Sequence, residues 1–309
     1  GALGRRDRDA MVAGARVEVA SYKEDPADFV LWKPSPAGTI GWDSPWGRGR
    51  PGWHIECSAM IEKHLGTTID IHGGGLDLIF PHHENEVAQS RCVHEGTPLA
   101  RYWLHNGFLS MAGSEKMSKS LGNVVTVGDL LERGHKGETL RLALLSAHYR
   151  QPLEWSEQLI AQSKSQLDRW YRAYATYLTV RDEVSSPPSG LSGFWEALSD
   201  DLNLPWALAT LNQFLRPTLE EFPKDVSRAT LIGDLKVAIQ IAQFLGFLTA
   251  TPQSWFQGEG DARIDGLIEA RAAAKKERNF AEADRIRSDL VAEGILLEDG
   301  PAGTTWRRA

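Results

Sequence analysis

The chain has 309 residues, 42% hydrophobic and 24% charged, which is the composition of an ordinary globular protein with room for two or three domains. Its formal net charge of −7 gives no general electrostatic basis for binding nucleic acid, and its two cysteines cannot build a disulfide framework. No apolar run approaches the roughly 18–20 residues that a membrane-spanning helix needs, and the N-terminus lacks the features of a signal peptide. We therefore expect a cytoplasmic protein with reduced cysteines.

The first half of the sequence alternates short strand-like runs with helical segments. We expect strands at 29–33, 68–72 and 102–111, helices at 54–64, from His82 onward and at 139–147, and a loop at 44–53. The strand at 68–72 should be buried and should end at the glycines 73–75. Strands and helices that alternate at this length predict a parallel sheet in an α/β fold.

The second half has a different character, because long amphipathic helices replace the alternation. Apolar residues recur at helical intervals over 159–179, and further helical patterns lie in 193–248, 264–276 and 281–292. Segments rich in proline, serine and glycine separate them. These shifts predict four parts with the boundaries 1–122, 123–158, 159–252 and 258–309.

A possible metal site combines Cys57 with His82 and Glu86. If the segment from His82 is helical, His82 and Glu86 are four residues apart and share one face. Sulfur, nitrogen and oxygen donors together favour zinc, although iron or cobalt suits the same donors. The same residues are also typical of a buried small side chain and of a solvated helix start, so the spacing alone leaves these alternatives open.

Two further segments carry groups that suit a nucleotide. Lys116 and Lys119 lie in a glycine-bordered loop, where two ammonium groups can converge on a polyphosphate. The glycine run 73–75 allows close approach of a ligand at Gly74, and Asp77 behind it can accept a hydrogen bond from a ribose hydroxyl. Surface lysines and glycine-rich turns are also common without any ligand, so an ordinary surface loop and an ordinary turn remain open as alternatives.

Taken together, the motifs resemble the cysteinyl-tRNA synthetase family of class I aminoacyl-tRNA synthetases. The sequence Lys116-Met-Ser-Lys-Ser120 matches the second signature of the class. Four more segments resemble the cysteine-specific branch: 44–60, 70–75, 80–86 and 294–308. The resemblance implies the C-terminal part of a Rossmann-like catalytic domain with the KMSKS loop at 1–122 and a stem-contact connector at 123–158. A tRNA-binding α-helical bundle at 159–252 and a small anticodon-binding module at 258–309 follow.

The resemblance also implies roles for single residues. Cys57, His82 and Glu86 would bind one Zn²⁺, which would select the thiolate of the substrate cysteine. Trp53 would form the floor of the cysteine pocket, with His72 and His83 lining it. Lys116 and Lys119 would act on ATP, which binds with Mg²⁺ and also contacts Gly74 and Asp77. Cys92 matches no ligand position and is interpreted as a packing residue.

The resemblance further implies partners and a reaction. The partners would be cysteine, ATP and cysteine tRNA, with no membrane, and a monomer is expected. Trp306, as an exposed aromatic, and Arg307 would read unstacked anticodon bases, although a packed C-terminus fits the same residues. The reaction would be activation of cysteine to an adenylate and its transfer to tRNA. Two alternatives are a non-catalytic RNA-binding module and a cysteine ligase of the mycothiol type.

Two elements of the family pattern are absent from this sequence. The first class I signature, His-Ile-Gly-His, is missing, and so is the family's fourth zinc ligand, a cysteine in a Cys-Gly-Pro-Thr-like stretch. We therefore expect an N-terminally truncated chain that holds zinc more weakly. By the same reasoning, this polypeptide alone should not activate cysteine.

Overall fold

The structure is a computed structural model that describes residues 2–4, 23–25, 28–111, 125–183, 192–216, 226–257, 262–300 and 303–308. Side chains are described for these residues except 262, 303, 305, 307 and 308. The chain divides into two compact units, Gly1–Ser110 with Tyr149–Leu153, and Met111–His148 with Glu154–Ala309. The four-part division drawn from the sequence stays a prediction.

The first unit is built around one parallel strand pair and two helices. Strand β3 (Ile69–Gly75) pairs in parallel with β4 (Ala100–Asn106), and α2 (Ile55–Leu65) and α3 (Glu84–Val93) pack on each other. Two short helical turns, η1 (Leu76–Leu78) and η2 (Ile79–His83), join β3 to α3. Phe80, inside η2, has an extended backbone (φ −139°, ψ 133°), so the continuous helical run begins only after it, in agreement with the helix expected from His82 onward. A separate antiparallel pair, β1 (Trp32–Pro34) with β2 (Gly49–Pro51), precedes α2.

Strand β3 corrects two expectations drawn from its sequence. Only Ile69 is buried, and Ile71 is 63% exposed, so the strand is not a buried one. The reason is that β3 pairs with β4 on one side only among the described residues. The glycines at 73–75 continue the ladder opposite Leu104, His105 and Asn106 instead of ending it.

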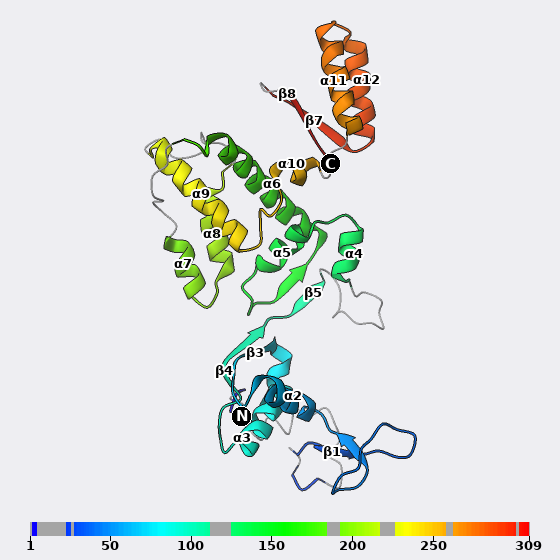
Figure 1. The fold of residues 1–309 in the computed structure, drawn as a ribbon, viewed down its shortest axis with the longest axis vertical. Coiled ribbons are helices and arrows are strands. Elements are labelled where there is room, and N and C mark those ends of the chain that lie inside the picture. Colours follow the sequence, from blue (N-terminus) through cyan, green and yellow to red (C-terminus); the bar gives the residue numbers. More distant parts are fainter. Residues whose placement is uncertain are drawn as a thin grey trace. The chain divides into compact units, whose positions relative to one another are not determined.

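The second unit contains a helical bundle (Figure 1). Its elements are α4 (Val127–Glu132), α5 (Gly137–Leu145), α6 (Glu157–Val180), α7 (Ser192–Ser199), α8 (Leu204–Phe214), α9 (Arg228–Phe244) and α10 (Pro252–Gln257). Ser156 caps the N-terminus of the long helix α6, because its hydroxyl accepts a hydrogen bond from the Leu159 amide. Its buried face supplies Trp170 and Tyr171 to the core. Strands β5 (Leu109–Met111) and β6 (Leu153–Trp155), where the chain passes from one unit to the other, form a further two-stranded sheet.

The small C-terminal module pairs two helices with a hairpin. Helices α11 (Ala262–Lys276) and α12 (Phe280–Ala292) pack against each other, and β7 (Ile295–Gly300) pairs antiparallel with β8 (Gly303–Arg308). The module has its own apolar core, made of Ile264, Ile286, Leu290, Ile295 and Trp306. Trp306 is only 3% exposed, which corrects the expectation of an exposed aromatic at this position. Across the part of the chain that is described, the helices are all too short or too polar to cross a membrane.

Candidate metal centre and its cleft

Three elements of the first unit bring the predicted metal ligands together. Cys57 lies in the first turn of α2, His82 in η2 and Glu86 in the first turn of α3. One donor atom from each of the three lies within 4.8 Å of the others. His82 Nε2 is 3.0 Å from Glu86 Oε1, as expected for residues four apart on one helical face.

Glu86 is the most enclosed of the three ligands. Its side chain is 1% exposed, and its second oxygen lies 3.1 Å from His72 Nε2. Burial tends to raise the pKa of this carboxyl, but contact with His72 and the charge on His82 outweigh it and lower the pKa. Burial, followed by the neighbouring Glu86 carboxylate, raises the pKa of the Cys57 thiol. The cluster thus holds a buried negative charge beside a thiol whose deprotonation a cation would favour.

The donor set fits a zinc ion. A carboxylate is expensive to bury without a cation or a protonated partner, and here its two oxygens face imidazole nitrogens that are neutral unless protonated. Thiolate, imidazole and carboxylate are the donors that zinc takes in proteins. A second group, His72, His83 and Glu86, also has its donor atoms within 4.8 Å of one another, and the sequence reasoning did not foresee it.

Further histidines surround the cluster, and two of them were missed in the sequence. His54 Nδ1 lies 2.5 Å from His82 Nδ1, and His83 Nδ1 lies 2.8 Å from His105 Nε2. Burial, followed by His82, lowers the pKa of His54 to about 4, so its ring is neutral near pH 7. A neutral His54 can accept a hydrogen bond from the Nδ1–H of His82, and in that tautomer the Nε2 of His82 carries the lone pair that binds a metal.

The signals for these two residues in the sequence were weak. His54 stands three residues before Cys57, but only the structure shows its positive φ of 74°, in the region that non-glycine residues seldom occupy. His105 reaches the cluster because β4 places it opposite Gly74 in the parallel pair. Strand pairing of this kind could not be read from the chain order.

A cleft of about 1540 Å³ adjoins the cluster in the first unit. Of the residues singled out in the sequence, Trp53, Cys57, Asp77 and His82 line it. His72, Gly74 and His83 are not among its lining residues, and His83 is only 2% exposed. His83 therefore lies behind the lining of this cleft, and its role in binding substrate stays a prediction.

Several predicted residues fall elsewhere. Lys116 and Lys119 lie outside the described residues, as does the rest of the phosphate loop. Cys92 is exposed, so the interpretation of it as a packing residue was wrong. The physical reason is its place near the end of α3, on a face that no other described element covers.

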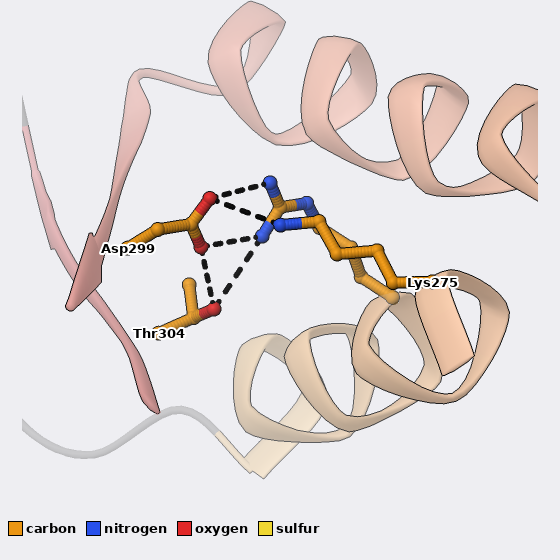
Figure 2. A network of polar contacts seen from close by, with 4 residues as sticks. Lys275, Asp299 and Thr304 are labelled. Carbon is orange, nitrogen blue, oxygen red and sulfur yellow. Dashed lines mark hydrogen bonds and ion pairs between the residues drawn. The ribbon is translucent and has the colours of Figure 1, made fainter. Parts of the chain in front are cut away.

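The C-terminal module contains a polar network around Asp299 (Figure 2). The two Nη atoms of Arg271 donate to the two carboxylate oxygens at 2.8 and 2.9 Å. The Thr304 hydroxyl and the Lys275 ammonium donate to the same carboxylate at 2.7 and 3.0 Å. Trp306 Nε1 donates to Asp265 at 2.9 Å, so its indole is a core group. The side chain of Arg307 lies outside what the structure describes.

Comparisons with known proteins identify two matched regions. The family of tRNA synthetases class I (C) catalytic domains matches residues 1–165, and the cysteinyl-tRNA ligase anticodon binding domain matches residues 257–307. Among solved structures, the ternary LeuRS–tRNA–LeuAMS complex of Agrobacterium radiobacter K84 agnB2 is similar, with a TM-score of 0.53 and 16% identity. The similarity covers 67% of this chain and 33% of that one, and it supports the class I synthetase fold alone.

Curated relatives extend the match over the whole chain. The cysteine–tRNA ligase of Parvibaculum lavamentivorans is 59% identical and that of Maricaulis maris 54%, in each case over 100% of this chain and 66% of the relative. The enzyme of the same name from Xanthomonas axonopodis pv. citri is 52% identical over 100% of this chain and 68% of its own length. The chain thus spans about two thirds of the length of these relatives. The two domain matches, together with 52% identity over the whole of this chain, show the family. The chain belongs to the cysteine–tRNA ligase family of class I tRNA synthetases.

Proposed function

We propose that this chain forms the part of a cysteine–tRNA ligase that selects cysteine and engages tRNA. The observation that carries the proposal is the meeting of Cys57, His82 and Glu86 beside the cleft. The relatives that bear this name support the reaction, which is ATP-dependent formation of cysteinyl-adenylate and transfer of cysteine to its tRNA. Mg²⁺ would accompany ATP, as is usual for nucleotide substrates.

A zinc ion held there would act as a Lewis acid that prefers a thiolate to a hydroxyl. The chemical need is clear, because cysteine and serine differ by a single atom and a pocket of side chains separates such isosteres poorly. In this proposal Cys57, His82 and Glu86 hold the ion, and His54 fixes the tautomer of His82 through its 2.5 Å contact. Trp53, 75% exposed on the cleft wall, would pack against the amino acid.

The remaining site residues have the following proposed roles. Asp77, exposed on the cleft wall, would accept from a ribose hydroxyl, and Lys116 and Lys119 would contact the ATP phosphates. Gly74 would contribute indirectly, because a side chain there would disturb His83. His72 would orient Glu86 through their 3.1 Å contact.

The match to an anticodon binding domain supports tRNA as the acceptor instead of an amino sugar. Arg307 would contact the anticodon, whereas the buried Trp306 would support the hairpin that carries it. We propose that the chain acts as a monomer.

Metal analysis tests the proposal on the chain as it stands. We expect purified protein to bind about one Zn²⁺ per chain, and cobalt-loaded protein to show a thiolate-to-metal absorption band. Cys57→Ala should abolish the band, while Cys92→Ala, which removes the other exposed cysteine, should leave it unchanged. L-cysteine should change the spectrum of the cobalt protein and L-serine should not. A band that survives Cys57→Ala, or equal responses to both amino acids, would overturn the proposal.

A further inference from the structure

The antiparallel pair β1–β2 places two cations side by side. Lys33 lies directly opposite Arg50, and both line the cleft. Like charges in this arrangement destabilise a strand pair, so the pair is a poor choice for stability alone. Arg50 Nη1 donates to the Ser35 hydroxyl at 3.0 Å, and Lys33 is exposed. The two acids among the lining residues, Glu56 and Asp77, come from α2 and η1, so positive charge gathers on the β1–β2 wall.

The same segment, residues 30–53, presents several indole rings. We call it the tryptophan hairpin. Trp32 and Trp53 line the cleft, and Trp42 and Trp46 are 56% and 78% exposed. The rings of Trp32 and Trp46 have centroids 6.4 Å apart. Large apolar side chains exposed together on one segment indicate a binding surface.

Hydrogen bonds hold the tryptophan hairpin in one conformation. The Arg48 guanidinium donates to the carbonyl oxygens of Ser35, Pro36 and Thr39 at 3.1 to 3.3 Å. Trp32 Nε1 donates to the Gly47 carbonyl at 3.3 Å. The backbones of Trp42 and Gly49 exchange two hydrogen bonds at 2.7 and 2.9 Å. The aromatic and cationic groups therefore project from a fixed scaffold, which lowers the entropy that binding must overcome.

Cations beside exposed aromatic rings recur in sites for single-stranded nucleic acid, where the cations contact phosphates and bases stack on the rings. We propose that the tryptophan hairpin binds the unpaired 3′ end of the RNA acceptor and leads it along the cleft toward Cys57 and His82. This inference rests on the proposed function, which makes RNA the acceptor. ATP offers the same phosphate chemistry, but a single nucleotide has one base, whereas the hairpin presents more than one exposed ring.

A binding experiment with two RNA stem-loops tests the proposal. One stem-loop ends in a short single-stranded 3′ overhang and the other is blunt. We expect the wild-type chain to prefer the overhang. Trp46→Ala should weaken the affinity for the overhang RNA at least about five-fold, which is the lower end of the loss expected when one ring that stacks on a base is removed. Trp195→Ala, at a tryptophan 54% exposed on α7, is the matched control and should leave affinity unchanged.

Charge removal gives an independent readout. Lys33→Met with Arg50→Met should reduce the slope of log affinity against log salt by about 1.4 for the overhang RNA, at about 0.7 for each phosphate that is no longer neutralised. Lys63→Met with Arg91→Met removes the same charge from exposed positions on α2 and α3 outside the cleft, and should not change the difference between overhang and blunt RNA. Lys33→Met alone leaves the hydrogen bond between Arg50 and Ser35 in place. This single variant provides the test if the double variant does not fold.

The possible outcomes separate this inference from the proposed function. The role of the hairpin is overturned if the wild type binds overhang and blunt RNA with equal affinity. It is also overturned if Trp46→Ala and Lys33→Met leave the affinity for overhang RNA unchanged. Loss of ATP binding in the charge variants with unchanged RNA binding assigns the cations to ATP and also overturns it. Neither result touches the selection of cysteine by the metal, which is tested by the cobalt spectra.

Discussion

In the C-terminal module a buried guanidinium and a half-exposed carboxylate share one ion pair. The side chain of Arg271 is 4% exposed and that of Asp299 is 46% exposed. Arg271, then Thr304 and Lys275, hold the pKa of Asp299 well below its usual range. The Nε of Arg271 is buried and has no hydrogen-bond partner among the described residues. The buried Arg271 guanidinium therefore needs Asp299 as its counterion. The Asp299 carboxylate needs Arg271 less, because water and Lys275 can also solvate its charge.

This asymmetry predicts unequal effects of removing each partner. Asp299→Ala leaves a buried positive charge without its counterion and should destabilise the module by about 3 kcal/mol. Arg271→Met leaves a half-exposed carboxylate that water can solvate, and the loss should be about 1 kcal/mol. Pulse proteolysis in urea measures both values. A larger loss for Arg271→Met than for Asp299→Ala would contradict this account.

At the scale of residues, local spacing could be predicted and long-range neighbours could not. The four-residue interval put His82 and Glu86 on one face, and they lie 3.0 Å apart. His54 and His105 could not be predicted from spacing. His54 reaches the cluster through an unusual backbone angle, and His105 reaches it through strand pairing. The predicted exposure of Trp306 was wrong because the sequence does not show which face of a short hairpin packs on the helices.

At the scale of elements, one glycine of β3, Gly74, is required by packing. A Cβ at Gly74 would lie 2.9 Å from both the His83 ring and the Leu78 side chain, and His83 is too buried to move freely. A Cβ at Gly73 would meet the Leu104 carbonyl at 3.4 Å, an ordinary contact. The role of this glycine run in nucleotide binding stays a prediction, and the space at Gly74 is limited by His83 and Leu78.

Paired alanine substitutions test this role of β3. Gly74→Ala should destabilise the first unit by roughly 1–3 kcal/mol, because it overpacks a buried site, and should weaken zinc binding by displacing the histidine cluster. Gly73→Ala, in the same strand, should change both quantities much less. Thermal unfolding and zinc titration of the two variants measure the difference. Equal effects of the two substitutions would show that backbone freedom, and not the space beside His83, is what the strand requires.

Element positions were more predictable than their burial. Helices α2, α5 and α6 lie within a few residues of their expected bounds, because amphipathic spacing is a local property. The burial of β3 was wrong because burial depends on which other strands and helices cover a strand, and the run at 68–72 carries no record of that.

At the scale of the whole molecule, the fold class was predicted correctly. The class I catalytic domain matches residues 1–165, and the anticodon-binding domain matches residues 257–307. Motif order and the change from alternating elements to long helices carried that prediction. The division into two compact units was not visible in the sequence, because the segment Tyr149–Leu153 joins the first unit from far along the chain.

The unit division gives a last prediction about metal and stability. All three proposed ligands belong to the first unit, so zinc should stabilise that unit and leave the bundle in the second unit unaffected. A ligand present at 100 times its dissociation constant stabilises the folded state that binds it by about 2.7 kcal/mol. Hydrogen exchange read by mass spectrometry resolves the two units, because peptides from α3 and from α6 are followed separately. We expect a chelator to speed exchange in α3 and not in α6, an effect that Cys57→Ala should reproduce without chelator and that Cys92→Ala should not. If chelation speeds exchange in both units alike, the metal acts on the whole chain and the site is not the one formed by Cys57, His82 and Glu86.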